Sequence, residues 1–407
     1  MPFRTGARLL VDQLLIQGVN HAFTVPGESF LPVLDALYDS REMVKLIVNR
    51  HESGATFMAE AYAKLTGQPG VAFVTRGPGA TNAAIGVHVA HQDSSPLILF
   101  IGQVGNDFIE REAFQEIDYR RMFGQMTKWV AQIDRADRVP EFVARAFQVA
   151  TSGRAGPVVL ALPEDMQTVK ADVGDALCHQ PVLGAPSDTQ IAALRRLLGR
   201  AQRPLVILGG FGWTPAACDN FKRFAEANYL PVACAFRYQD LFDNRHPNYI
   251  GDVGVGVNPK LAQRIKDADL ILAIGPRLGE MTTSGYTLLD APVPAQTLIH
   301  VHAGAEELGR VFQAQLMINS GLPQFASRLA MMVPVEEPPW RESVASAREE
   351  LEAWQQRPAV YAHGDPPLDL WEAMQILSRA VPPDAIIANG AGNFATWAHR
   401  FWRYSGL

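Results

Sequence analysis

Three short segments rich in glycine or charged residues follow apolar runs early in the sequence. They read Val-Pro-Gly-Glu-Ser at 25–29, Arg-His-Glu-Ser-Gly-Ala at 50–55 and Thr-Arg-Gly-Pro-Gly-Ala-Thr-Asn at 75–82. Gly27 would let the backbone approach a ligand closely, and Ser29 could cap the following helix. A single segment of this kind is more often an ordinary strand-to-helix turn. Three on consecutive predicted strands predict a ligand site, because parallel sheets bind ligands at the carboxyl ends of their strands.

Glu52 is the candidate acid of this site. It stands where an apolar strand meets a predicted helix at 56–65, between the other two segments. Partial desolvation there would disfavour the charged carboxylate and suit the group to sharing a proton. A glutamate at a helix start is also explained by its favourable interaction with the helix dipole. The neighbouring turns favour the first interpretation.

Several other chemistries lack the residues they need. The segment 75–82 is not a Walker motif, because no Gly-Lys-Ser/Thr follows it. Cys178, Cys218 and Cys234 contain no Cys-x-x-Cys pair, so neither a disulfide framework nor a zinc site is predicted, and a cytoplasmic location is expected. The 36 basic and 42 acidic residues, with a net charge of -6, form no long runs, which argues against nucleic-acid or membrane partners. No apolar run reaches the roughly 18–20 residues that span a bilayer.

Short apolar runs alternate with helix-length segments and predict an α/β fold of parallel sheets covered by helices on both faces, that is, doubly wound. An amphipathic helix opens the chain, with Thr5 as its N-cap and Gly18 as its stop. Buried strands are predicted in the first half at 22–25, 46–48, 71–75, 97–101 and 158–162. In the second half, helices are predicted at 194–198 and around 341–354, and strands at 205–208, 270–274 and 298–301.

The length of 407 residues exceeds what one hydrophobic core usually serves, so two or three domains are expected. The first is assigned to 1–168, and the stretch 167–186 loses periodicity, which is typical of a linker. A Rossmann-like second unit is assigned to 187–333. Residues 360–407 hold one helix, a predicted strand at 385–388 and the start of an aromatic helix. They are interpreted as the beginning of a third domain that is incomplete in this chain.

A series of motifs in the first domain occurs together in one known family. The motifs are Val25-Pro26-Gly27, His51-Glu52-x-Gly54-Ala55, Ala61-Tyr62-Ala63-x-x-Thr66-Gly67, Gly77-Pro78-Gly79-Ala80-Thr81-Asn82, Asp93-Ser94 and Ile101-Gly102. Together they resemble the pyrimidine-binding domain of thiamine-diphosphate enzymes of the acetolactate synthase group. The resemblance extends over the whole chain.

The resemblance implies that thiamine diphosphate binds at these turns. The implied pyrimidine-side residues are Pro26, Gly27, Glu52, Thr75, Pro78, Gly79 and Asn82, and the implied diphosphate-side residues are Gly392, Asn393 and Phe394. The cofactor carries the difficult chemistry at a carbon that must lose a proton. Glu52 would be the acid that hydrogen-bonds the pyrimidine ring nitrogen, so that the aminopyrimidine can take that proton.

The implied reaction is the decarboxylation of a 2-keto acid and the joining of the remaining fragment to a second carbonyl compound, as from pyruvate to 2-acetolactate. The segment 110–118 resembles the substrate-facing part of acetolactate synthases, so Phe114 and Gln115 would shape the acceptor side, and Gln115 is a catalytic candidate. His88 and His91 could face the same cleft, although such a pair on a helix is more often structural.

Three alternatives stay open at this point. One is a benzoylformate decarboxylase-like or glyoxylate carboligase-like enzyme, and another is a non-catalytic homologue that keeps the pyrimidine half of the site. A nicotinamide dehydrogenase that uses 209–212 is disfavoured, because the spacing is not Gly-x-Gly-x-x-Gly.

The family pattern is weaker in the second and third domains. Acetolactate synthases carry FAD in the central domain, which makes Gly209, Gly210 and Arg277 a candidate FAD site. However, His300-Val301-His302 departs from the family pattern, and a dinucleotide fold without a ligand is the alternative. The family holds Mg2+ through a Gly-Asp-Gly motif and a later Asn that this sequence does not contain, so no metal ligand is expected in it. The resemblance also implies a homodimer or dimer of dimers with the cofactor between subunits.

Overall fold

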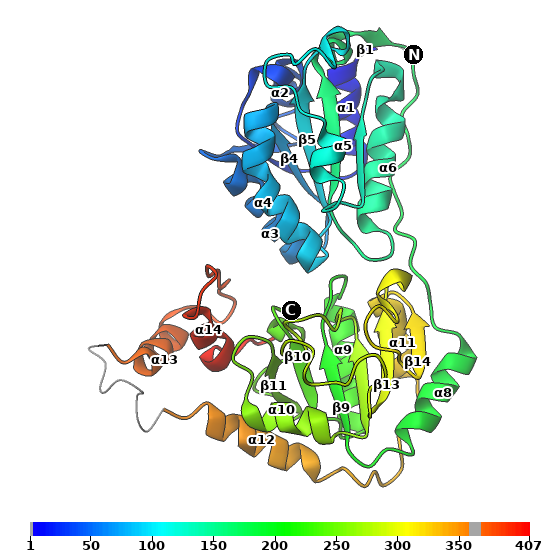
Figure 1. Cartoon of the computed structure of the whole chain (residues 1–407), viewed down its shortest axis with the longest axis vertical. Helices are drawn as coiled ribbons and strands as arrows, with labels where there is room; N and C mark the ends of the chain where they lie inside the picture. Colours follow the sequence, from blue (N-terminus) through cyan, green and yellow to red (C-terminus); the bar gives the residue numbers. More distant parts are fainter. Residues whose placement is uncertain (1–2, 358–367) are drawn as a thin grey trace. The chain divides into compact units, whose positions relative to one another are not determined.

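The computed structural model describes residues 3–357 and 368–407. The chain divides into two compact units, with the boundary between Leu183 and Gly184. Each unit is built on a six-stranded sheet in which every printed pairing is parallel, and helices cover both faces (Figure 1). The predicted α/β fold of successive doubly wound parallel sheets is therefore confirmed.

The sheet of the first unit has the order β3-β2-β4-β5-β7-β6. Its strands are β2 (His21–Thr24), β3 (Lys45–Val48), β4 (Gly70–Val74), β5 (Leu97–Gln103), β6 (Trp129–Gln132) and β7 (Val158–Pro163). The helices are α1 (Gly6–Ile16), α2 (Leu31–Asp39), α3 (Glu52–Thr66), α4 (Gly77–Asp93), α5 (Tyr119–Phe123), α6 (Val139–Thr151) and α7 (Glu164–Thr168). The short strands β1 (Arg4–Thr5) and β8 (Lys170–Ala171) pair with each other.

Alternating side chains on the central strands divide the core of this unit in two. Phe73, Phe100 and Leu160 pack on one face with α1, α2 and α6. Ala72 and Leu99, their neighbours along the strands, pack on the other face with α3, α4 and α5. Because successive side chains of a strand point to opposite faces, apolar residues at every position require helices on both sides.

The sheet of the second unit has the order β11-β10-β9-β12-β13-β14. Its strands are β9 (Pro204–Leu208), β10 (Val232–Ala235), β11 (Tyr249–Val253), β12 (Leu270–Ile274), β13 (Thr297–His302) and β14 (Leu316–Asn319). The helices of this unit are α8 (Asp188–Leu198), α9 (Pro215–Ala227), α10 (Pro259–Asp267), α11 (Leu322–Ala330), α12 (Ser343–Trp354), α13 (Leu370–Ala380) and α14 (Ala395–Phe401). The apolar residues of α8, α9 and α11 pack on one face, and those of α10 pack on the other.

Two local predictions for the first helix are confirmed. The Thr5 hydroxyl caps α1 by accepting a hydrogen bond from the Arg8 N–H at 3.2 Å. Gly18, just after the helix, has a φ of +84°, a conformation that glycine adopts without steric cost. These two residues delimit the helix that supplies Leu10, Val11 and Leu14 to the core.

Other local predictions are wrong. Strand β3 is not buried: it lies at the sheet edge, and Val48 is 61% exposed. The stretch 167–186, predicted to be a linker, packs against the first unit at its beginning. Gln167 is fully buried, and β8 pairs with β1. Residues 385–388 form no strand, and Ile386 is exposed because no neighbouring strand in the described residues covers it. The assignment of a third domain to 360–407 stays a prediction, and its first residues, 360–367, lie outside the described residues.

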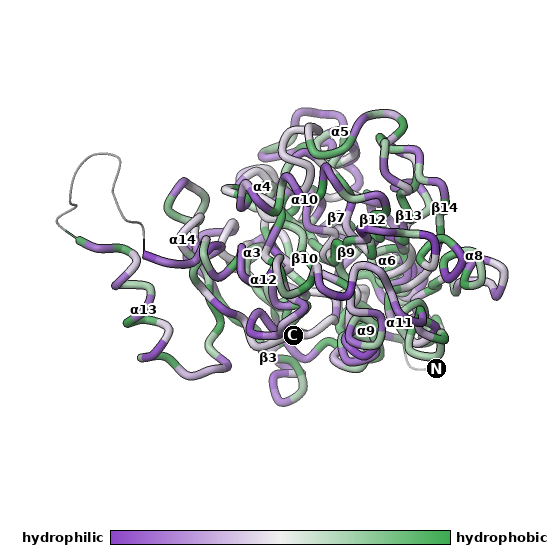
Figure 2. The backbone as a smooth tube through the Cα atoms, turned by 90° about the horizontal axis from the view of Figure 1, so that it is seen from below, coloured by the Kyte–Doolittle hydropathy of each residue, from purple (hydrophilic) through white to green (hydrophobic). Residues whose placement is uncertain are grey.

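Helix α13 exposes an apolar side. Figure 2 shows apolar and polar residues alternating along it, and none of its residues is buried. Leu370, Ile376 and Leu377 are all exposed. Within the described ranges, no helix combines the length and the apolar character that crossing a bilayer would require.

Candidate functional site

The carboxyl ends of the parallel strands bring the predicted segments together at one edge of the first sheet. A Cβ atom on Gly27 would lie 2.5 Å from the Cβ of Thr75, so the turns after β2 and β4 touch and only glycine fits there. Ser29 does not cap α2 as predicted; its hydroxyl hydrogen-bonds that of Thr75 at 2.9 Å. Buried Gln167 supports the same turn by donating to the Ser29 carbonyl at 2.8 Å. Gln167 was missed because its stretch reads as a polar linker.

Helices α3 and α4 cross at very close range, at Thr56 of α3 and at Gly86 of α4. A Cβ on Gly86 would lie 2.2 Å from the hydroxyl oxygen of Thr56, and that hydroxyl donates to the Ala83 carbonyl at 3.1 Å. Residues four apart lie on the same side of a helix. The crossing therefore also brings together Glu52 and Asn82, each four residues before the contact.

The Glu52 carboxyl group is held at the start of α3. His51 caps the helix by accepting a hydrogen bond from the Ser53 N–H at 3.2 Å, which makes Glu52 the first helical residue. Asn82 donates from its side-chain nitrogen to Oε2 of Glu52 at 2.9 Å. A Cβ on Gly79 would lie 3.5 Å from Oε1. Oε2 is thus engaged by the Asn82 amide, and Gly79 leaves the backbone beside Oε1 without a side chain.

This arrangement fits the pyrimidine side of thiamine diphosphate. Glu52 is half-buried, so its carboxyl group is reachable from outside while partly shielded from water. Gly27 and Gly79 leave the neighbouring backbone free of side chains. A carboxyl group positioned by an amide beside bare backbone can bind a ring nitrogen by a shared proton.

The loop from 110 to 116 presents the predicted substrate residues. Glu110, Glu112 and Gln115 have φ angles of +61°, +54° and +66°, which are uncommon for residues with a side chain. The Glu116 carboxylate accepts hydrogen bonds from the main-chain N–H groups of Glu110 at 2.7 Å and Ala113 at 3.0 Å. Phe114 is 78% exposed.

The same loop is joined to the start of α4. The Gly77 N–H donates to the Gln115 carbonyl at 3.0 Å. The contact brings the main chain of Gln115 next to the turn that carries Pro78 and Gly79. The two histidines of α4 lie elsewhere, because His88 and His91 are about 120° and 180° around the helix from Asn82.

In the second unit, the backbones of two glycine turns meet. Gly210 and Gly275 have φ angles of +78° and +86°, and a Cβ on Gly210 would lie 2.2 Å from the Gly275 carbonyl oxygen. The indole N–H of Trp213 donates to the Gly209 carbonyl at 2.8 Å. Arg277 pairs with buried Glu307 at 3.3 Å. The close approach of the two backbones accounts for glycine at 210 and 275, and Glu307 gives Arg277 an acidic partner.

The diphosphate-side candidates lie in the turn before α14. Gly392 has a φ of +151°, and Phe394 is exposed with its ring against Gly392. Among residues 3–357 and 368–407, no three His, Cys, Asp or Glu side chains form a group that could hold a metal ion.

Buried His300 makes the second unit sensitive to acid. Its Nε2 lies 2.9 Å from the Pro276 carbonyl and must carry the proton, because a carbonyl only accepts. Burial lowers the pKa of His300 to about 4. The unfolded chain binds this proton near pH 6.5 and the folded chain only near pH 4, so stability falls as the pH drops through this window, by on the order of 3 kcal/mol at most.

We therefore expect His300→Gln to reduce the loss of stability between about pH 7 and pH 4.5. Glutamine can donate to the Pro276 carbonyl but does not titrate. Urea unfolding at the two pH values measures the effect, and His88→Gln, on the exposed side of α4, is the control. If the free energy of unfolding fell equally between the two pH values in His300→Gln and in the wild-type protein, His300 would not be the source of the acid sensitivity.

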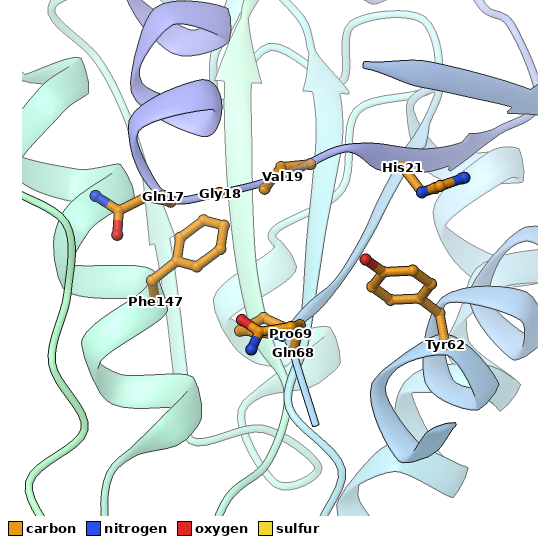
Figure 3. A pocket seen from close by; sticks show the side chains of 8 residues that line it. All are labelled: Gln17, Gly18, Val19, His21, Tyr62, Gln68, Pro69 and Phe147. Carbon is orange, nitrogen blue, oxygen red and sulfur yellow. The ribbon is translucent and has the colours of Figure 1, made fainter. Parts of the chain in front are cut away.

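A hollow at the opposite edge of the first sheet does not belong to this site. It is lined by Gln17, Gly18, Val19, His21, Tyr62, Gln68, Pro69 and Phe147 (Figure 3). His21 and Tyr62 both hydrogen-bond Oδ1 of Asn20, each at 2.8 Å. These residues lie at the amino ends of the strands, away from Glu52.

Two sets of comparisons describe what the chain is similar to. Residues 4–122 match the family "Thiamine pyrophosphate enzyme, N-terminal TPP binding domain", and residues 191–329 match "Thiamine pyrophosphate enzyme, central domain". The chain is 30% identical to the acetolactate synthase isozyme 2 large subunit of Escherichia coli K12, over 97% of the chain and 69% of that protein. It is 33% identical to the large subunit from Parasynechococcus marenigrum, over 98% and 65%, and 30% identical to that of Lactococcus lactis, over 98% and 69%. The chain thus spans about two thirds of the length of these relatives.

Proposed function

The chain belongs to the thiamine pyrophosphate (thiamine diphosphate) enzyme family, and from this premise we propose that it acts in an acetolactate synthase-like carboligase. The substrate would be a 2-keto acid, with pyruvate as the first candidate. The observation that carries the proposal is the Glu52–Asn82 hydrogen bond beside Gly79, at the carboxyl edge of the first sheet. The similarity to acetolactate synthase large subunits supports the choice of reaction.

Each residue of the site has a role in this proposal. Bound thiamine diphosphate would supply a carbon that adds to the keto group once its proton has been removed. Glu52 would share a proton from Oε1 with the pyrimidine ring, and Asn82 would hold Oε2 still. Pro26, Gly27, Thr75, Pro78 and Gly79 would form the surrounding backbone cradle.

The loop from 110 to 116 would contact the substrate. The exposed Phe114 ring offers an apolar surface for the acceptor, and Gln115 a polar side chain. We propose that these two residues select the acceptor and that Gln115 takes part in the reaction. A non-catalytic homologue would have no use for a carboxyl group held in this way.

We further propose that the cofactor lies between subunits of a homodimer or dimer of dimers. Within two turns of the Glu52–Asn82 pair, helices α3 and α4 expose large apolar side chains, namely Phe57, Met58 and Ile85. Apolar side chains that gather beside a site are typical of a surface that a partner covers.

The diphosphate half of the site is assigned to residues 360–407, which we propose begin a third domain after domains at 1–168 and 187–333. The exposed apolar side of α13 supports this, because such a helix needs a partner to cover it. Gly392, Asn393 and Phe394 would form the first turn on the diphosphate side, and no residue of this sequence is assigned to Mg2+. A cytoplasmic location stays a prediction.

The function is tested with the full-length protein supplied with thiamine diphosphate, Mg2+ and pyruvate. We expect acetolactate, detected as acetoin after acid treatment. Carbon dioxide release from an aromatic keto acid without turnover of pyruvate would reject the acetolactate assignment and keep the cofactor. Flavin absorbance of the purified protein would decide whether Gly209, Gly210 and Arg277 hold FAD.

A further inference from the structure

Arg76 connects three segments at the carboxyl edge of the first sheet. It is the residue before α4, and its guanidinium forms an ion pair with the Glu164 carboxylate at the start of α7. A second nitrogen, Nη1, donates to the main-chain carbonyl of Phe114 at 3.2 Å. Arg76 is 38 residues before Phe114 and 88 before Glu164, so only the fold brings the three together.

The segment that Arg76 holds is conformationally unfavourable on its own. Glu110, Glu112 and Gln115 all have positive φ angles within six residues. Such residues keep these conformations only when surrounding contacts impose them. Some of the contacts come from inside the loop, through Glu116, and others from outside it, through the Gly77 N–H and Arg76.

The placement of the guanidinium has a cost of its own. Its Nε is buried and has no hydrogen-bond partner among the described residues. A buried donor without an acceptor is rare and unfavourable. The two contacts of the terminal nitrogens, to Glu164 and to Phe114, must therefore outweigh this loss.

We propose that Arg76 is a positioning residue, anchored on Glu164, that holds the 110–116 loop so that Phe114 and Gln115 face the substrate. The role in catalysis rests on the proposed function, whereas the control of loop conformation does not. Arg76 acts through the main chain of Phe114 and is not itself assigned a contact with substrate. Its loss should therefore affect substrate use and leave the Glu52–Asn82 pair intact.

Trypsin cleavage after Arg111, an exposed residue within the loop, reports the loop directly. We expect Arg76→Ala and Glu164→Gln to speed this cleavage by about tenfold, because cleavage follows the population of locally opened chain. Arg76→Lys keeps the positive charge but not the planar set of guanidinium N–H donors, and should give an intermediate cleavage rate. Arg264→Ala is the matched control, since Arg264 pairs with Glu350 and Ser346 in the second unit. Unchanged cleavage in both Arg76→Ala and Glu164→Gln would overturn the proposal.

Kinetics of the full-length enzyme test the link to substrate. We expect kcat/KM for the 2-keto acid to fall by about tenfold in Arg76→Ala and in Glu164→Gln, with thiamine diphosphate affinity within about twofold and an unchanged melting temperature. A loosened loop with unchanged kcat/KM, or an equal loss of cofactor affinity, would overturn the positioning role. If the variants are cleaved faster but the wild-type protein does not turn over 2-keto acids, the proposed function is rejected, whereas the role of Arg76 in loop conformation is supported. Glu164→Gln keeps the test valid if Arg76→Ala does not fold.

Discussion

Replacing Glu52 with glutamine is expected to lower the turnover of 2-keto acids by about 10²- to 10⁴-fold, the usual contribution of a positioned acid or base. Glutamine keeps the shape of the side chain but cannot share a proton from the position of Oε1. The fold should survive, because Glu52 is half-buried at a helix start and its bond to Asn82 can be kept through the amide oxygen. The thermal unfolding midpoint should therefore stay close to that of the unchanged protein.

Two measurements separate proton transfer from binding. The exchange of the thiazolium C2 proton with deuterium in bound thiamine diphosphate should slow with the turnover, and the affinity for the cofactor should change far less. Glu42→Gln, at an exposed surface position, is the control and should change neither. Undiminished C2 exchange in Glu52→Gln would contradict the role given to Oε1.

Asn82→Ala tests the other member of the pair. The substitution removes the donor to Oε2 and leaves the acid present. The expected loss of turnover is therefore smaller, about tenfold, as for a single hydrogen bond to a charged group. A loss as large as that of Glu52→Gln would mean that Asn82 does more than hold the carboxyl group.

Gly86→Ala is expected to lower the free energy of unfolding by about 1–3 kcal/mol, the usual cost of overpacking. The added methyl group would overlap the hydroxyl and backbone of Thr56, so the helices α3 and α4 must separate. The sign of this change in unfolding free energy is informative, because alanine in place of glycine within a helix otherwise stabilises a protein by roughly 0.5–1 kcal/mol. Separation of the helices would also draw Glu52 and Asn82 apart and reduce turnover, although neither residue is changed.

Denaturant unfolding and keto acid turnover of the same variant measure the two effects. Gly105→Ala is the control at the same edge of the sheet, because its Cβ would lie 3.7 Å from the nearest atom and its φ is -56°. A Gly86→Ala protein that is as stable as the unchanged one would show that the crossing has room to adjust.

Most of the buried central strands could be predicted from the sequence. Strands β4, β5, β7, β9 and β12 consist almost entirely of buried apolar residues, so short apolar runs between helix-length segments were sufficient. Strands β6, β10, β11 and β14 were missed. For β6 and β14 the reason is that they lie at sheet edges and only one residue of each is buried. Strand β10 is central and fully buried, but it is only four residues long. An edge strand carries a weaker apolar pattern because one of its sides lacks a neighbouring strand.

The sequence by itself determined which residues could do chemistry, and the tertiary structure decided which of them meet. Glu52 and the glycine turns were recognisable from their types and their places after apolar runs. The bond from Asn82 to Glu52, by contrast, requires the close helix crossing at Gly86, where a side chain would clash. The positive φ angles of the 110–116 loop occur where Glu116, Gly77 and Arg76 contact its main chain. Residue type and spacing report local preference, whereas contacts between distant segments depend on how closely the packed backbones approach one another.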